Sequence, residues 1–355
     1  MKQLLLASCV ALVCLDGQTI KTNYKAEQAF QIEVQSTFTM ETTDFSMERD
    51  GEPVEARWGA GGGSTVTRSI IITDTVLQAE DGSPTRLTRE FESISNDSAR
   101  SRGDEEFESS QECPLSEVTL ELTLDDGEVT AEVVDGTEPD DEALLEGHQM
   151  TFALDALLPE KDVAPGDEWD LSIEQLQTAL LVDLESVLFP RPERTEGEEG
   201  GSGRGGRRGG MRAGRGGGGV ARYISAGDWE VTATLLGDTE EYDGTECLVI
   251  SIKGESTGEL PESERAPGGG RRGGGNALFL GPSLRPENSF EMEIEARLFY
   301  DAKAERPVHF EFEGQLSTES RREMNRRETA MVISTAQEGT FTYSVDLTSA
   351  DRGDE

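Results

Sequence analysis

The sequence predicts a mainly β protein: an antiparallel curved sheet or half-barrel with one packed amphipathic helix and disordered Gly/Arg-rich loops. Long stretches alternate between apolar and polar residues, and such spacing places every second side chain on one face of a strand. Asp-Gly pairs separate several of these stretches and favour hairpin turns. One segment, 173–189, has apolar residues at helical spacing instead.

The balance of charge limits the partners of the chain. Its 355 residues have a formal net charge of −40 and a pI of about 4.3. Carboxylates at this density keep a folded surface solvated and oppose binding to nucleic acid or anionic lipid. They suit cationic partners, divalent ions or a salty medium, and their plainest interpretation is the solvated surface of a secreted protein.

Residues 1–17 are expected to form a secretory signal peptide. Lys2 is followed by an apolar run from Leu4 to Leu15, which is too short to span a bilayer, and no later segment is long and apolar enough to do so. The tetrapeptide that ends at Cys9 matches a lipoprotein pattern in its letters, but the apolar run continues past it. The expected location is therefore secreted or periplasmic, with a lipid-anchored form as the alternative.

The N-terminal β half is predicted to span residues 30–192, after a polar lead-in at 18–29. Within it, Asp81-Gly82 predicts a hairpin turn, and the polar, acidic stretch 95–114 is expected to be a mobile loop. The clearest hairpin covers 118–133, where apolar residues alternate on both sides of an Asp-Gly pair. Met150, Phe152 and Leu154 then predict one more strand.

A fixed corner follows at Pro159 to Trp169, where two prolines restrict the backbone and Trp169 supplies a large apolar anchor. We expect this corner to be the crossing between two β-rich halves. Ser172 and Gln175 have the spacing of a capping box, so a helix should begin there and run over 173–189. Its apolar stripe is expected to cover the open face of the sheet, with binding of a partner as the alternative.

Two low-complexity tracts, 193–219 and 261–276, are predicted to be disordered because neither can pack a core. They are expected to contact the acidic body of the protein itself or an anionic surface polymer. RNA binding is disfavoured because the tracts lack aromatic residues for base stacking and the whole chain is acidic. The arginines that would contact a polyanion are Arg204, Arg207, Arg208, Arg212, Arg215, Arg271 and Arg272.

The C-terminal β half is predicted to span residues 220–349, before an acidic tail at 350–355. The longest uninterrupted alternation runs from Phe290 to Tyr300, and the strand 308–312 should pair with it. The charged stretch 317–329 is expected to be a loop or the edge of a strand.

The corner at Pro159–Trp169, the turn and strand at 243–247 and the paired strands at 290–312 loosely resemble a broad group of uncharacterised secreted bacterial β-rich proteins. Members of that group often have a Pro…Val-x-x-Gly-Asp-x-Trp corner. The resemblance covers about residues 115–315 and implies an exported, sheet-dominated fold. It transfers no catalytic residues, and the two Arg/Gly tracts depart from it and look like insertions in loops.

No motif points to catalysis or to a cofactor, and none is expected. The two histidines, His148 and His309, lie in or beside strand patterns and are expected to be ordinary strand residues. A Ser/His/Asp site or a zinc site would have to use one of them, but no spacing singles out a nucleophile.

Two further candidate sites, a disulfide and a calcium site, each have an alternative interpretation. Cys113 and Cys247 remain if the signal peptide is removed, and they would form either one disulfide or two reduced thiols. Calcium is the best metal candidate because hard cations prefer oxygen ligands, although a solvated acidic loop is the favoured interpretation. Its ligands would come from Asp135, Asp140, Asp141 and Glu142, which lack the order of an EF-hand.

The function predicted from the sequence is that of an exported, non-catalytic envelope or extracellular protein. It would bind an apolar small molecule or an envelope component in the concave face of the sheet. The second hypothesis is a structural or interaction protein that acts through its acidic surface and Arg/Gly loops. The third is a hydrolase of unknown substrate.

Overall fold

The computed structural model describes residues 17–54, 62–103, 105–150, 153–182, 184, 188–189, 220–260, 287–326 and 329–350. The predicted signal peptide up to residue 16, both Arg/Gly tracts and the acidic tail after residue 350 lie outside the described residues.

The described residues form thirteen strands and a few short helical segments. The strands are β1 (Ala29–Arg49), β2 (Glu52–Pro53), β3 (Gly62–Glu80), β4 (Ser83–Arg102), β5 (Glu105–Glu112), β6 (Thr119–Asp125), β7 (Glu128–Asp135), β8 (Glu168–Asp170), β9 (Gly227–Tyr242), β10 (Thr245–Glu259), β11 (Glu287–Asp301), β12 (Arg306–Arg326) and β13 (Thr329–Ser349). The helices are α1 (Ile173–Ala179) and α3 (Ala221–Ala226), and two 3-10 helices are η1 (Glu142–Leu145) and η2 (Ala153–Leu157).

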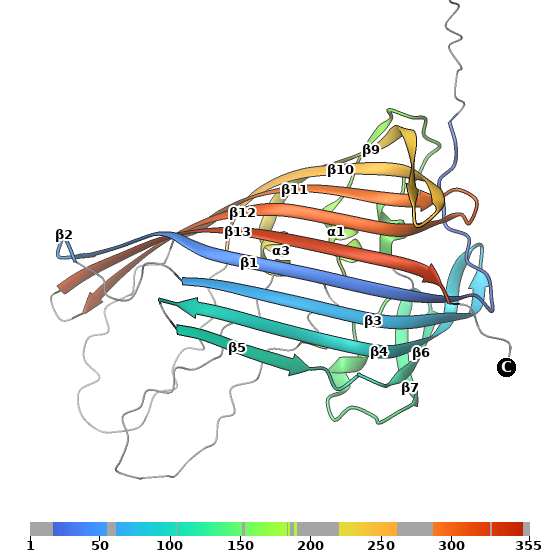
Figure 1. Ribbon diagram of the computed structural model, residues 1–355, viewed down its shortest axis with the longest axis horizontal. Coiled ribbons are helices and arrows are strands. Elements are labelled where there is room, and N and C mark those ends of the chain that lie inside the picture. The colour runs from blue at the N-terminus through green and yellow to red at the C-terminus, as the bar shows by residue number, and fades with distance from the viewer. Residues whose placement is uncertain are drawn as a thin grey trace, which may run out of the picture.

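All of these strands belong to one open, curved antiparallel sheet, which confirms the predicted fold class. The strand order is β7-β6-β4-β3-β1-β13-β12-β11-β10-β9-β8, with β2 beside β1 and β5 beside β4. Figure 1 shows the strands curving around α1 and α3, which lie on the concave side. The first and last long strands, β1 and β13, pair from Phe30 opposite Ser349 to Arg49 opposite Met331. This pairing joins the two halves at the centre of the sheet.

The concave face holds the main core because most of the alternating apolar residues point to it. Register aligns Ile32, Ile72 and Phe91 across three neighbouring strands, and all three are buried. Gly314 allows a close approach at the centre of this face. A Cβ atom at that position would lie 2.1 Å from Cζ of Phe341, so only glycine leaves room for the ring.

The predicted hairpins are confirmed. The turn between β6 and β7 has positive φ at both central residues, 49° at Asp126 and 87° at Gly127, as a two-residue hairpin loop requires. Turns at Asp81-Gly82 and Asp243-Gly244 join their strands in the same way. The alternation 290–300 is part of β11 and pairs with β12 as expected.

The stretch 95–114 is not a mobile loop, which corrects the prediction. β4 runs through it to Arg102, and β5 pairs with β4 from Glu105 to Glu112. Every residue of β5 is exposed except one, so neither face shows an apolar alternation. A strand that buries neither face carries no hydrophobic signal in its sequence. At 317–329 the strand interpretation is right, because β12 continues to Arg326 and β13 begins at Thr329.

The helix predicted at 173–189 is interrupted after Ala179 rather than continuous. The capping box at Ser172 and Gln175 is present, but α1 ends at its C-cap Leu180, and Leu181 has a φ of 51°. Val182 and Leu184 are helical again. Leu180 and Leu181, which lie at the break, are both buried.

Two other segments differ from expectation on the concave side. Residues 153–157 form η2 rather than a strand, and Leu154 and Leu157 are buried there, while residues 151 and 152 lie outside the described part. The lead-in at 18–29 is not simply polar, because Ile20 and Tyr24 are buried. Tyr24 packs edge-on against Phe30 at 5.6 Å, which closes this end of the core. Ile20 and Tyr24 are not part of a periodic apolar pattern, so the sequence does not predict that they are buried.

Candidate functional site

A small cavity lies between the helical segments and the concave face of the sheet. Its volume is about 20 Å³, roughly the room for one water molecule. One wall consists of helical and adjacent residues that include Leu180, Val182 and Ile224. The opposite wall belongs to the sheet and includes Phe38, Val66, Phe312 and Phe341. The cavity is therefore mostly apolar.

A row of polar side chains crosses the sheet beside these apolar residues. Ser36 of β1 lies opposite Tyr343 of β13 and Arg68 of β3, and all three line the cavity. The Arg68 Nε donates to Oδ1 of Asn96 on β4 at 3.4 Å. The guanidinium also lies 5.4 Å from the ring centroid of Phe189, close enough for a cation–π contact. A cation is thus placed at the edge of an apolar cavity.

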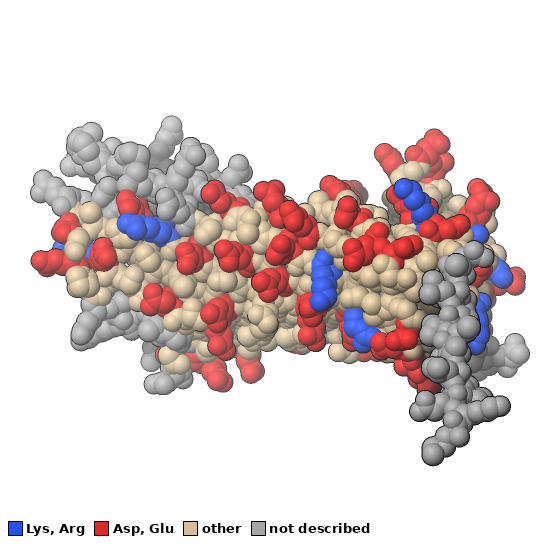
Figure 2. Space-filling view, turned by 90° about the horizontal axis from the view of Figure 1, so that it is seen from above, with Lys and Arg blue, Asp and Glu red and all other residues tan. Residues whose placement is uncertain are grey.

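The two faces of the sheet differ in charge. Glu255 of β10 faces outward and lies directly opposite a glutamate on each side, Glu230 and Glu293. Figure 2 shows that carboxylates far outnumber basic side chains on the face that it presents. On the concave face, the inward position of β3 beside the cavity is instead Arg68, opposite Ser36 of β1.

A buried ion pair lies in the concave core near the β3–β4 hairpin. Asp74 and Arg89 are opposite each other in the register and are 4% and 1% exposed. The Arg89 guanidinium donates through Nε and through Nη2 to the two carboxylate oxygens of Asp74. This pair was not among the predicted sites, although the sequence contains a signal for it. Each charged residue stands at an inward position of an otherwise apolar alternation, beside Ile72 and Phe91 respectively.

His148 is buried beside this pair, in a loop rather than in a strand. It is 5% exposed, and its ring centroid lies 5.9 Å from that of Phe91. Its Nε2 lies 2.9 Å from the carbonyl oxygen of Leu144, whereas Nδ1 has no hydrogen-bond partner within the described part of the chain. Burial, together with the nearby Arg89 charge, lowers the pKa of His148 to about 4. The imidazole is therefore neutral near pH 7, with Nε2 donating to the carbonyl.

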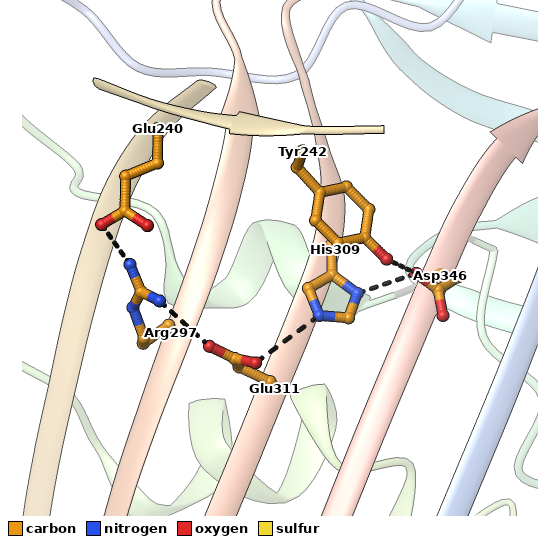
Figure 3. A network of polar contacts seen from close by, with 6 residues as sticks. All are labelled: Glu240, Tyr242, Arg297, His309, Glu311 and Asp346. Atoms are coloured by element: carbon orange, nitrogen blue, oxygen red, sulfur yellow. Dashed lines mark hydrogen bonds and ion pairs between the residues drawn. The ribbon is translucent and has the colours of Figure 1, made fainter. Parts of the chain in front are cut away.

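The other histidine, His309, belongs to a polar network on the outer face (Figure 3). Its ring stacks on that of Tyr242 at 4.1 Å between centroids, and its Nδ1 lies 2.8 Å from Oδ1 of Asp346. The Tyr242 hydroxyl donates to the same carboxylate oxygen. Nε2 of His309 lies 3.9 Å from Glu311, and Arg297 bridges from Glu311 to a further glutamate on β9. The hydrogen bond from His309 lowers the pKa of the Asp346 carboxyl, and the bond from Tyr242 adds to this effect.

A bend in the β9–β10 hairpin brings Tyr242 to this network. Residues 236–238 of β9 have the single residue Val249 opposite them, because the register shifts there. Such a bulge bends the strands, and the end of the hairpin covers a small apolar cluster outside the main core. Cys247, Val249 and Phe299 form that cluster, and Tyr242 packs against it. The network therefore pins the hairpin to the outer face.

Of the two alternatives for Cys113 and Cys247, the structure has the reduced thiols: both cysteines are free and buried. Cys113 lies in the main core after β5, whereas Cys247 lies on β10 in the outer cluster. Cys113 follows β5, which pairs with β4, and Cys247 is on β10. Five strands lie between β4 and β10 in the sheet: β3, β1, β13, β12 and β11. Because a disulfide needs Cα atoms within about 7 Å, the alternative of two reduced thiols is the one that the fold permits.

The candidate calcium ligands Asp135, Asp140, Asp141 and Glu142 do not come together as a metal site. Within the described ranges, no three acidic, histidine or cysteine side chains lie close enough together to hold a metal ion. Asp141 instead accepts a hydrogen bond from the backbone N–H of Ala143 at 3.0 Å and caps η1. The seven arginines predicted to contact a polyanion all lie outside the described residues. None of the described helices is long and apolar enough to cross a membrane.

Comparison with known proteins gives no sequence relative. No protein family matches the chain, and no curated protein does. Among solved structures, the chain is similar to one that describes lipid–protein interactions in lipovitellin, with a TM-score of 0.34, 8% identity and coverage of 94% of this chain. The chain spans 26% of that lipovitellin chain.

Two further solved structures have lower scores. The outer membrane protein OprG from Pseudomonas aeruginosa has a TM-score of 0.19 and 6% identity, with 93% of this chain and 99% of that one covered. The toluene transporter TodX from Pseudomonas putida has a TM-score of 0.13 and 8% identity, with coverage of 93% and 96%. Scores this low transfer no site to this chain, so its function has to be argued from its own residues.

Proposed function

We propose that the protein is an exported, non-catalytic binding protein that holds an apolar ligand against the concave face of its curved sheet. The observation that supports this proposal is the apolar cavity between that face and the segment around Leu180. Apolar pockets with a few placed polar groups are the usual form of a small-molecule site. Here Phe38, Phe312 and Phe341 supply the apolar wall.

The cavity is closed in this structure, and the wall around Leu180 is the part that can move. A ligand pocket usually has a volume of about 300 Å³ or more, so this cavity of about 20 Å³ must open. Leu181 has a φ of 51°, a conformation that costs a residue other than glycine about 1–2 kcal/mol. Displacement of the segment 180–182 relieves that strain and exposes the aromatic wall.

Binding of a neutral, environment-sensitive naphthylamine dye to the purified protein tests this proposal. We expect its fluorescence to rise on binding and the rise to be lost in Val66→Phe, because the larger ring fills the cavity. Val134→Phe is the matched control, since Val134 is 51% exposed on β7, away from the cavity. Val182→Phe fills the same cavity from the other wall and replaces Val66→Phe if that variant does not fold. No dye binding by the wild-type protein would contradict the proposal.

A second candidate function is favoured by the outer face. Glutamates that lie directly opposite each other on neighbouring strands repel, as Glu255 does with Glu230 and Glu293. A cationic partner would relieve this repulsion, so the second proposal is an interaction protein that docks basic segments on this face. Isothermal titration with an oligolysine peptide should show binding that weakens steeply with salt in the wild type and less steeply in Glu255→Gln. Equal salt dependence in both proteins would count against this face.

A further inference from the structure

The segment 136–150, between β7 and η2, is held to the concave core by few contacts. Most of its residues are exposed, and the side chains that it buries include Leu144, His148 and Met150. Within the described residues its backbone hydrogen bonds stay inside the segment, as from the Leu144 N–H to the Asp141 carbonyl. Segments with few buried contacts and a solvent-exposed backbone open locally at a lower free energy than sheets do. This segment can therefore leave the core while the sheet stays folded.

His148 is the polar one of these three buried side chains. Its ring packs against Phe91, and its Nε2 donates to the Leu144 carbonyl at 2.9 Å. Its Nδ1 has no hydrogen-bond partner in the described part of the structure. A neutral imidazole needs an acceptor for one N–H only, whereas an imidazolium donates from both nitrogens. Uptake of a proton would thus create a buried N–H without an acceptor, which destabilises the closed position of the segment.

The charges around His148 also disfavour a proton on its ring. Arg89 of β4 is a buried cation near the ring, and both carboxylate oxygens of its partner Asp74 already accept from the guanidinium. The half-buried Asp155 of η2 acts on Tyr24, and burial raises the pKa of that hydroxyl, so Tyr24 is neutral. The carboxylates of the segment itself are exposed: Glu138, Asp140, Asp141, Glu142 and Glu146. An imidazolium would therefore be a second buried cation beside an anion that is already paired.

From this geometry we infer that the segment 136–150 is an acid-released flap: a proton that His148 takes up from solvent drives the flap off the concave face, while the sheet beneath stays folded. Its departure uncovers apolar core residues such as Phe91. The flap covers another part of the concave face than the cavity beside Leu180, so the inference goes beyond the proposed function and does not depend on its ligand. The apolar face under the flap is thus shielded near neutral pH and accessible in mild acid.

Hydrogen–deuterium exchange of the wild-type protein at about pH 7 and about pH 5.5, a range above the usual titration of carboxyl groups, tests the inference. Mass spectrometry follows the exchange, and each rate is corrected for the intrinsic rate at that pH. Peptides that contain Leu144 and Glu146 should lose about eightfold of their protection, because the pKa of His148 is about 4 when buried and about 6.5 when solvated. The Phe91 amide, which donates to the Val118 carbonyl, should keep its protection because the strands stay paired.

His148→Phe keeps an aromatic ring against Phe91 but cannot take up a proton, so the flap of this variant should be equally protected at both pH values. His148→Leu replaces it if that variant does not fold. His309→Gln is the matched control, because it removes the other histidine of the chain and should still show the loss. Equal protection of the wild-type flap at both pH values, or the same loss in His148→Phe, would overturn the inference. A parallel loss of protection at Phe91 would also overturn it, because the whole sheet would then be opening.

Discussion

The Arg89 guanidinium donates two hydrogen bonds, of 2.8 and 2.6 Å, to the two carboxylate oxygens of Asp74 inside the concave core. Both residues belong to the β3–β4 hairpin, and both are almost fully buried. Each charge is neutralised by the other. If one partner were removed, the remaining charge would be buried without a counter-ion and without water to solvate it. The ion pair therefore stabilises the register of this hairpin, in addition to the packing of its apolar residues.

Removal of one partner should be costly. Asp74→Asn leaves the Arg89 charge buried without its anion, so we expect the free energy of unfolding to fall by about 3–5 kcal/mol. Urea denaturation followed by circular dichroism measures the loss. The double variant Asp74→Leu with Arg89→Met replaces the pair by apolar residues and should lose less than the single variant. A single variant as stable as the wild type would show that the pair is not buried in solution.

His148 should make the protein less stable in mild acid. Its folded-state pKa of about 4 lies below the value of about 6.5 for an unperturbed histidine. The unfolded state therefore binds more protons between these values. The stability contribution is complete above about pH 6.5 and is lost as the pH falls toward about 4, with a total of about 3 kcal/mol.

A variant without this titration isolates the effect. His148→Phe should have a shallower decline in unfolding free energy than the wild type over this pH range, whatever its absolute stability. Urea denaturation at several pH values gives the slope of unfolding free energy against pH for each protein. The other titrating side chains contribute equally to both slopes. Parallel slopes would show that His148 is solvated when the protein is folded.

The Asp346 carboxyl on the outer face should titrate at a lower pH than an ordinary aspartate. The pKa of Asp346 is lowered chiefly by its hydrogen bond with His309 and further by Tyr242. A carboxylate with a lowered folded-state pKa stabilises the protein above its unfolded value of about 3.9, and this stability is lost as the pH falls through the folded value. In an NMR titration, the pKa of Asp346 should rise more in His309→Gln than in Tyr242→Phe. The reverse order would assign the main hydrogen bond to Tyr242.

Relief of like charge should stabilise the sheet. Glu255 is exposed and lies opposite Glu230 on one side and Glu293 on the other. Glu255→Gln is expected to raise the free energy of unfolding by about 0.2–1 kcal/mol at low ionic strength, and the gain should shrink as salt is added. Differential scanning calorimetry at several salt concentrations checks this.

Glu319→Gln serves as the control for this prediction. Glu319 faces Ser289 on β11 and Ala336 on β13, so no carboxylate lies directly opposite it. Its loss should change the melting temperature less than the loss of Glu255. Equal gains in the two variants would point to the net charge of the chain rather than to the facing pairs.

Much of the candidate site lay beyond sequence reasoning because its members come from distant segments. Tyr242, His309 and Asp346 meet on the outer face from three strands, although 104 residues separate Tyr242 from Asp346. Each is an ordinary polar residue in its own strand pattern. By contrast, Asp74 and Arg89 lie in one hairpin, so their inward positions could have been paired from the turn at Asp81-Gly82 alone.

The sequence by itself determined most of the long strands, their inward faces and their hairpin turns, because alternation and Asp-Gly pairs act over a few residues. Tertiary structure alone decided the rest. The order of strands placed Cys113 and Cys247 far apart across the sheet, and the predicted helix is interrupted at Leu181, which has a positive φ. β5 became a strand by pairing with β4 rather than by any apolar pattern of its own. Such outcomes depend on contacts between segments far apart in the chain, which no local spacing encodes.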